Sequence, residues 1–222
     1  MEFNLAKPAR FLLLIALAVS VLSAHAQYFH PKNIDVGAGV LWQYTTQLAS
    51  DGQVGGGGIN HQYTTNPVGF VAQLRDSPRA LLGFEVNYAY THPTESYNYY
   101  YNNGTLTSLS VPTGTNEFTL AYLARPHLLF LHPFFSIGGG LMGFAPDHAG
   151  SAVTGTTATL QTQWRGAGVA EVGLDLQLHD HLGVRVQTRL VGTRAPNFHA
   201  LVISTDSWTL STEPSVGGYY RF

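Results

Sequence analysis

The chain has 222 residues, a formal net charge of −2 and no cysteine. The missing cysteines exclude disulfides and cysteine-based metal sites, and the lack of a basic excess argues against a nucleic-acid partner. Only 11% of the residues are charged, well below the roughly 25% of typical soluble domains. A soluble domain needs charge on its surface, so the composition favours a surface that faces lipid.

Residues 1–26 have the pattern of a secretory signal peptide. Lys7 and Arg10 precede an apolar run over residues 11–22, and an Ala-x-Ala cleavage site ends at Ala26. The run is too short to cross a hydrocarbon core of ~30 Å comfortably, so we expect cleavage after Ala26 rather than a membrane anchor. Residues 27–222 then form one domain, which is predicted to be a β-barrel from the patterns that follow.

Eight later segments alternate apolar and polar residues with the two-residue period of a β-strand. The predicted strands cover residues 34–44, 68–75, 82–90, 117–125, 134–142, 169–177, 184–190 and 208–222. Long polar breaks (45–66, 91–115, 145–161 and 192–205) alternate with short turns near residues 76–79, 126–132 and 179–181. This alternation predicts an all-β, eight-stranded antiparallel up-and-down transmembrane barrel with short periplasmic turns and long extracellular loops.

The two faces of these strands differ in charge. One face is apolar or aromatic, and the other gathers the acidic and basic residues together with glycine. A soluble barrel would place its apolar residues inside, so charge inside and apolar residues outside require lipid as the external solvent. The alternative is chance placement in a soluble β-sandwich, which is disfavoured because an outward Arg or Lys costs ~2–4 kcal/mol at the bilayer midplane.

The last strand carries a second signal. Val216, Gly218, Tyr220 and Phe222 share one face and end the chain on an aromatic residue. This ending resembles the final strand of bacterial outer-membrane barrels, and with residues 182–189 the chain resembles the eight-stranded barrels of the OmpA and OmpX type.

The resemblance implies a location in the outer membrane of a Gram-negative bacterium, in contact with its lipid and lipopolysaccharide. It also implies that those four residues are read by the barrel-assembly machinery, after delivery by periplasmic chaperones, and that the barrel is a monomer. Pro214 conflicts with a regular strand because it has no N–H to donate. We therefore expect a bulge or a broken ladder at Glu213 and Pro214, with regular pairing only from Ser215 onward.

The inward charges are the first candidate site. Eight strands enclose a space that side chains fill, so buried ions there must pair. The expected lumen network consists of Glu85, Glu117, Arg125, Glu171, Arg185 and Arg189. A structural polar core is favoured over a gated pore, which remains the alternative.

The second candidate is a tyrosine-rich segment in the break at residues 91–115. Tyr97, Tyr99, Tyr100 and Tyr101 lie among asparagines, a composition common on adaptable binding surfaces. The alternative is an ordinary surface loop without a ligand. Other aromatic residues are expected at the membrane interfaces: Trp42, Tyr44, Tyr88, Tyr90, Trp164 and Trp208.

Histidines near two short turns are weaker candidates. His179, His181, His127 and His132 could gather a metal if the two turns met, but solvated turn residues are the simpler reading, and we expect neither metal nor cofactor. Some barrels of this size deacylate lipid A with a His-x-Ser element, which the stretch starting at His199 lacks. We therefore expect a structural or surface-interaction protein, adhesin-like or receptor-like, without catalysis. A narrow passive pore is the first alternative and a lipid-modifying enzyme the second.

Overall fold

The computed structural model describes residues 34–50, 58–77, 82–101, 106–126, 132–148, 159–199 and 207–222. The expected signal peptide, residues 1–26, lies outside these residues, and so does His127. No helix in the described part of the chain is both long and apolar enough to span a membrane.

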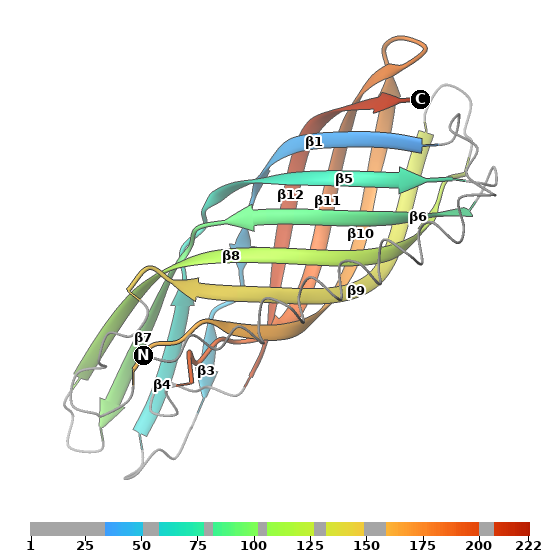
Figure 1. Ribbon diagram of the computed structural model, residues 1–222. Helices are drawn as coiled ribbons and strands as arrows, with labels where there is room; N and C mark the ends of the chain where they lie inside the picture. Colours follow the sequence, from blue (N-terminus) through green and yellow to red (C-terminus); the bar gives the residue numbers. More distant parts are fainter. Residues whose placement is uncertain are drawn as a thin grey trace, which may run out of the picture.

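Eight antiparallel strands close into a tilted barrel (Figure 1). Neighbours in the barrel follow one another along the chain, and β12 pairs with β1 to close the wall. The barrel strands are β1 (Ile34–Trp42), β5 (Val68–Asp76), β6 (Leu82–Thr91), β8 (Leu106–Ala124), β9 (His132–Pro146), β10 (Gln163–Gln177), β11 (Leu182–Arg194) and β12 (Trp208–Arg221). This confirms the predicted fold class and the number of barrel strands.

The barrel has a short-turn end and a long-connection end. Strands β5, β8 and β10 end at the short-turn end, where β12 also ends next to Phe222 (Figure 1). At the long-connection end, β8 continues beyond the barrel and pairs with β7 (Thr94–Tyr101). The sheet extends further through β4 (Gly58–Thr64) and β3 (Leu48–Ser50), while β2 (Tyr44–Thr45) pairs with β12. We call the sheet β3-β4-β7-β8 the extension.

The extension corrects the prediction for two breaks, 45–66 and 91–115, which were expected to be polar loops and contain strands instead. The alternation there is hard to read from the sequence, because polar residues occupy the buried face. Gln62 and Glu95 are buried, with 3% of each exposed. Polar side chains, which in a sequence usually indicate exposure to solvent, thus form part of the interior of this sheet.

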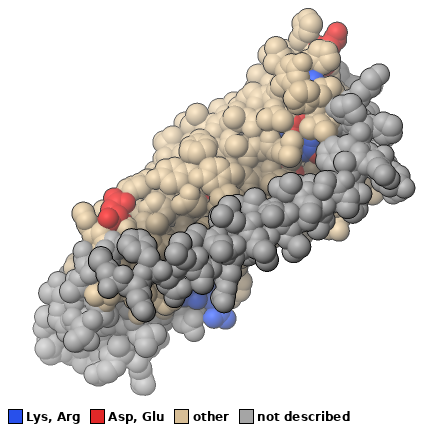
Figure 2. Space-filling view, in the orientation of Figure 1, with Lys and Arg blue, Asp and Glu red and all other residues tan. Residues whose placement is uncertain are grey.

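The outer surface of the barrel is apolar, as the strand pattern predicts. Val36, Leu120 and Val172 are 47%, 57% and 60% exposed, while charged neighbours on the same strands, Asp35, Glu117 and Glu171, are buried. Figure 2 shows uncharged residues over the middle of the barrel and charged ones toward its ends. An apolar belt of this extent is stable only against lipid.

The seam between β12 and β1 adapts to Pro214 without a bulge. On the β11 side the ladder is unbroken, with Thr188 opposite Pro214, so the prediction of regular pairing only from Ser215 onward is wrong there. On the β1 side pairing stops at Leu41–Ser215 and resumes at Tyr44–Thr212 in the same register.

The direction of the backbone groups explains this difference. Even-numbered residues of β12 turn their N–H and C=O groups toward β1 and β2, as the bonds from Phe222 N to Ile34 O and from Thr46 N to Leu210 O demonstrate. The N–H that Pro214 lacks therefore belongs to the β1 seam only. The hydrogen bonds between β12 and β11 do not involve the backbone nitrogen of Pro214.

Candidate functional site

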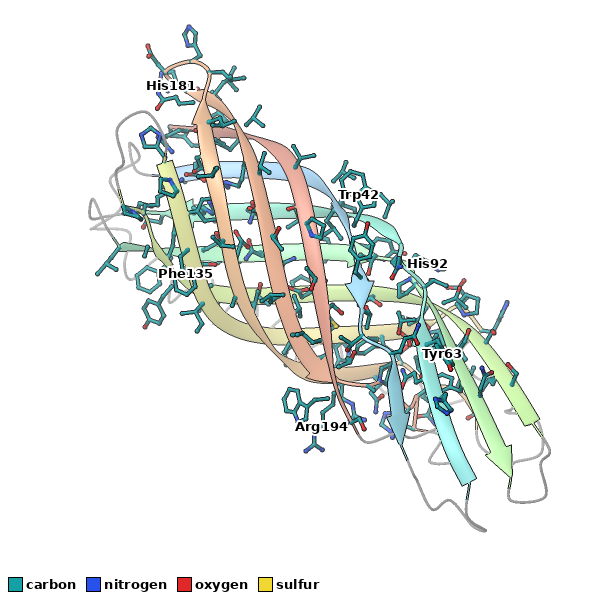
Figure 3. All side chains as sticks on the ribbon, turned by 180° about the vertical axis from the view of Figure 1, so that it is seen from behind. Trp42, Tyr63, His92, Phe135, His181 and Arg194 are labelled. Carbon is teal, nitrogen blue, oxygen red and sulfur yellow. The ribbon has the colours of Figure 1, made fainter. Side chains whose placement is uncertain are left out.

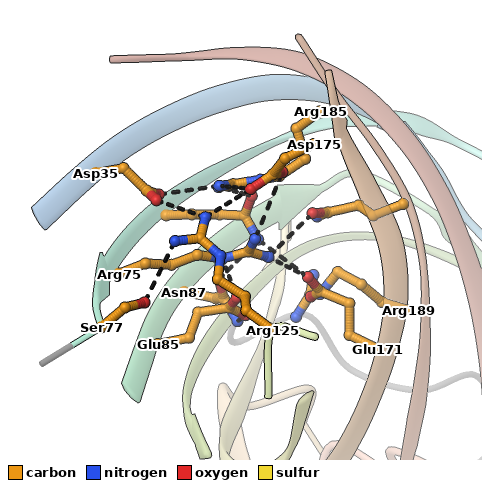
Figure 4. Close-up of polar contacts among 12 residues, drawn as sticks. Asp35, Arg75, Ser77, Glu85, Asn87, Arg125, Glu171, Asp175, Arg185 and Arg189 are labelled. Atoms are coloured by element: carbon orange, nitrogen blue, oxygen red, sulfur yellow. Dashed lines mark hydrogen bonds and ion pairs between the residues drawn. The ribbon is translucent and has the colours of Figure 1, made fainter. Parts of the chain in front are cut away.

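The interior of the barrel holds a continuous network of ion pairs, part of which is drawn in Figure 4. Much of it follows from strand register, because oppositely charged residues stand directly across from one another. These cross-strand pairs are Arg75–Glu85, Asp35–Arg75, Asp35–Arg221, Glu171–Arg189, Asp175–Arg185 and Arg189–Glu213.

Nearest the short-turn end, two aspartates share two arginines. Arg185 donates to Asp35 at 2.9 Å and to Asp175 at 2.7 Å. Arg125 reaches the same two carboxylates at 2.7 and 2.6 Å. Both aspartates are fully buried. Breaking such a group leaves a buried charge without a partner, which is strongly destabilising.

Arg75, 3.8 Å from Asp175, and Glu171 join this group to a second one deeper in the barrel. The Glu171 carboxylate accepts from Arg75 at 2.6 Å and lies 3.4 Å from Arg189. Arg189 also pairs with Glu213 at 2.9 Å and with Glu117. The fully buried arginines, Arg75 and Arg189, are thus held between carboxylates from several different strands.

Aromatic rings complete this polar layer. The ring of Phe134, 1% exposed, lies 3.9 Å from the guanidinium carbon of Arg75, and the Tyr219 ring lies 4.9 Å from that of Arg185. Both distances allow cation–π attraction. Gly173 makes room for Phe134, because a Cβ at that position would lie 2.5 Å from the ring.

All six residues of the expected lumen network lie inside the barrel, and each takes part in an ion pair. Asp35, Arg75, Asp175 and Glu213 also belong to the network, although the set predicted from the sequence does not include them. Asp35 and Asp175 stand near strand ends. Strand tilt brings such ends together, so distance along a strand is a poor measure of depth.

Toward the long-connection end the interior holds an apolar cluster beside buried uncharged polar residues such as Gln43 and Thr115. Phe198, fully buried, enters from the β11–β12 connection and packs with Val191, Val169, Met142 and residues of neighbouring strands. Phe198 and His199 have φ of 47° and 63°, a left-handed conformation that non-glycine residues adopt at a cost. The contacts around Phe198 must therefore stabilise this backbone.

Hydrogen bonds hold the same segment across the barrel mouth. Gln161 N donates to Phe198 O at 3.1 Å, and Gln163 exchanges hydrogen bonds of 2.9 and 3.0 Å with Asn197. The hydroxyl of Tyr97 on β7 donates to Pro196 O at 2.8 Å. A cavity of about 20 Å³ remains next to Glu95, room for about one water molecule. The described side chains therefore close the lumen.

The tyrosines of the expected binding loop belong to β7. Tyr97 is 2% exposed and packs inside, so it does not form part of the outer surface as the sequence analysis proposed. Tyr99, Tyr100 and Tyr101 pair through their backbone with β4, and Tyr99 and Tyr100 also with β8, while their side chains lie outside the described part.

Beside Tyr97, the carboxylate of Glu95 accepts from Gln62 at 3.0 Å and from Thr64 at 2.8 Å. Burial raises the pKa of Glu95, and these two hydrogen bonds oppose the rise only in part.

Of the turn histidines, His132, His179 and His181 lie in the described part of the chain. His181 makes a hydrogen bond of 2.9 Å with Arg221 O and stacks on Tyr220. Among the described residues no three His, Asp or Glu side chains converge as a metal site would require. Of the expected interfacial aromatic residues, Trp42, Tyr44, Trp164 and Trp208 are exposed at the long-connection end, and Figure 3 shows Trp42 on the outer surface.

Comparison with solved structures identifies the fold as that of the eight-stranded outer-membrane barrels of the OmpA and OmpX type. The chain is similar to OprG of Pseudomonas aeruginosa, with 15% identity, a TM-score of 0.55, and coverage of 88% of this chain and 98% of that chain. It is also similar to Neisserial surface protein A, with 12% identity, a TM-score of 0.50, and coverage of 86% and 97%. No protein-family model and no curated protein sequence matches the chain.

Proposed function

We propose that this chain is an integral outer-membrane protein of a Gram-negative bacterium, which holds its β-sheet extension at the cell surface for a structural or surface-interaction role. The observation that carries the proposal is the continuity of β8. This one strand of 19 residues forms part of the barrel wall and then an edge-to-edge partner of β7. The barrel and the extension are therefore joined by one continuous strand, which supports the rigid placement that a presented binding surface requires.

The packed interior of the extension supports the same role. Glu95, Gln62 and Thr64 share hydrogen bonds, and Tyr97 joins the extension to the mouth of the barrel. A preformed surface loses less conformational entropy on binding than a flexible loop does. An adhesin-like or receptor-like interaction, with Tyr99, Tyr100 and Tyr101 as contact residues, is the finer form of the proposal.

Its biogenesis follows from the same placement. The signal peptide is removed after Ala26, periplasmic chaperones deliver the chain, and the barrel-assembly machinery reads its last strand. Of the residues assigned to that signal, Val216, Tyr220 and Phe222 are 44%, 43% and 54% exposed on the outer face. A partner that meets the barrel from outside can therefore contact them. The proposed protein is a monomer, in contact with outer-membrane lipid and lipopolysaccharide, and needs no cofactor and no catalytic group.

The test of the surface role uses two variants in cells that display the chain. In the first, an Asn-Gly turn replaces residues 97–109 and joins Ser96 to Ser110, which are opposite each other across β7 and β8. In the second, Tyr99, Tyr100 and Tyr101 are changed to Ser and the buried Tyr97 is kept. Binding to a glycan array and cell–cell aggregation should fall in both, while heat-dependent migration in SDS gels stays that of a folded barrel.

Two measurements address the rival functions. Stepwise single-channel currents from the purified wild-type chain in planar bilayers would favour a passive pore over the closed lumen proposed here. A change in the mass spectrum of lipid A on expression of the chain would favour a lipid-modifying enzyme. Equal binding and aggregation by wild type and both variants would contradict the surface role itself.

A further inference from the structure

The outer wall has one hollow on the side that faces lipid, with a volume of about 510 Å³, among the pockets found in the described residues. This volume lies within the ~300–1,000 Å³ range of small-molecule sites. Gly166 and Gly168, which we call its floor, line it together with Trp164, Trp208 and Arg194, the last residue of β11 at the long-connection end. The other lining residues are Gly140, Arg165 and Ala167. Exposed apolar residues such as Val172 and Leu190 fill the corresponding outward positions elsewhere on these strands.

The register explains why the wall is hollow here. Gly168 lies opposite Gly139 of β9 on one side and opposite Gly192 of β11 on the other, so three neighbouring strands lack a side chain at one level. A Cβ added at Gly166, Gly168 or Gly192 would meet no atom within 4 Å. Glycine weakens a strand interior, and packing inside the protein does not require it at these positions.

The contacts of the two tryptophan rings lie outside the floor. The Trp164 ring covers Gly143, where a Cβ would lie 2.8 Å from its atoms, and its centroid lies 6.3 Å from the Phe118 ring. Trp208 pairs with Arg194 across β11 and β12, with the guanidinium carbon 5.9 Å from the ring centroid. Rings at the membrane interface are suited to lining the upper part of a lipid chain.

The charge at the edge selects the kind of lipid. In the barrel strands that the structure describes, Arg194 is the one positively charged residue on the outward face, and Figure 3 shows it projecting from the wall. Asp76, the outward acid, stands at the opposite end of the barrel. An outward arginine near the interface attracts anionic headgroups, and its guanidinium matches a phosphate in geometry.

We infer that this hollow binds a lipid with a net-negative phosphate headgroup from the outer leaflet, its acyl chain on the glycine floor and its phosphate against Arg194. The inference rests on the proposed outer-membrane placement, since that placement puts the hollow in lipid and Arg194 at the outer interface. It goes further in assigning one lipid class to one place on the wall.

The test uses tryptophan fluorescence, because Trp164 and Trp208 line the hollow and the third tryptophan, Trp42, does not. The full chain with Trp42→Phe is inserted into phosphatidylcholine vesicles that contain a minor share of brominated phosphatidylglycerol, whose bromines quench by contact. An arginine at an anionic surface predicts quenching about fivefold stronger than from the same share of brominated phosphatidylcholine.

Two variants separate the headgroup from the floor. Arg194→Gln should remove the preference for phosphatidylglycerol, that is, the stronger quenching by its brominated form. Arg194→Lys should retain most of this preference. Gly168→Leu should remove the preference by filling the hollow. Val172→Leu, at an outward position of the same strand nearer the short-turn end, should leave the preference unchanged. A preference that persists in Arg194→Gln, or in a folded Gly168→Leu barrel, overturns the inference.

A separate measurement tests the membrane placement independently of the lipid site. A chain with Trp164→Phe and Trp208→Phe reports only Trp42, which should be quenched equally by the two brominated lipids. No quenching of Trp42 by either lipid would overturn the membrane placement. Ordinary quenching of Trp42 with no preference at Trp164 and Trp208 would overturn the lipid site alone.

Discussion

The hydroxyl of Tyr97 donates a 2.8 Å hydrogen bond to the carbonyl oxygen of Pro196, 99 residues later in the chain. Through this bond the extension is connected to the segment that closes the barrel mouth. The ring of Tyr97 also packs edge-on against Phe198, with centroids 6.4 Å apart. The surface sheet and the closure of the lumen therefore depend on the same side chain.

Tyr97→Phe should loosen both regions together. It removes the hydrogen bond to Pro196 O and a longer one of 3.4 Å that the hydroxyl accepts from Gln62, at a cost of about 1 kcal/mol in local stability. Hydrogen exchange should speed up in residues 94–101 and in residues 195–199 and remain unchanged in β1 and β5. Faster exchange in β7 alone would contradict a connection between the two regions.

Glu95 should make the stability of the extension depend on pH. Burial raises its pKa in the folded chain, so the unfolded chain ionises first as pH rises. The stability that the protonated carboxyl contributes is complete below its unfolded pKa and is lost as pH rises through the folded pKa. Amide protection in β4 and β7, corrected for intrinsic exchange rates, should thus be greater at mildly acidic than at neutral pH.

Glu95→Gln is the matched control for that measurement. The amide oxygen can still accept from Gln62 and Thr64, and no charge is buried at any pH. The difference in protection between the two pH values should disappear. A difference that remains in this variant would assign the pH dependence to another group.

Arg185→Ala should strongly destabilise the barrel. It leaves Asp35 and Asp175, both fully buried, without one of their cations, and loss of one partner of a buried ion pair costs about 3–5 kcal/mol. The folded fraction should fall at lower urea in detergent micelles, as read from migration in SDS gels. An unchanged unfolding midpoint would show that the network does not stabilise the barrel.

Arg221→Ala provides the comparison. Arg221 lies 3.8 Å from Asp35, and its side chain is 26% exposed. Partly solvated pairs contribute about 0–1 kcal/mol, so this variant should unfold close to wild type. Equal losses of stability in both variants would indicate that the change in net charge, rather than the burial of the ion pair, causes the effect.

Pro214→Val should complete the ladder between β12 and β1. The new N–H faces Trp42, where pairing is interrupted, and it should be protected from exchange. The gain of about 1 kcal/mol from a hydrogen bond is partly offset, because removing proline gives the unfolded chain roughly 0.4–1 kcal/mol more conformational entropy. If NMR spectra of the variant show that the new amide at position 214 exchanges readily, the seam is open for another reason.

Val216→Pro tests the same rule in the opposite direction. Val216 faces Val40 across the seam, deeper in the wall, where an unsatisfied backbone group in lipid costs several kcal/mol. This variant should fail to reach the folded, heat-modifiable form. Normal folding would mean that the β1 seam does not need a continuous ladder.

Local pattern was enough to predict the barrel. The residues Val36 to Trp42 alternate visibly, and residues 76–79 have the composition of a short turn, so strand number, inward and outward faces and the alternation of connections could all be predicted. These features depend on each residue and its near neighbours. The polar strands β4 and β7 were missed because Gln62 and Glu95 are buried by contacts that the local sequence does not record.

The sequence by itself determined that charged side chains face inward and apolar ones outward, because period-two alternation assigns every residue to a face. Only the tertiary structure decided which of them meet. Strand tilt and register bring Asp35 and Asp175 to the same arginine, place the Tyr97 hydroxyl against Pro196 O and align Gly139, Gly168 and Gly192 at one level of the wall. Such contacts join residues far apart in the chain, and their geometry exists only once the barrel has closed.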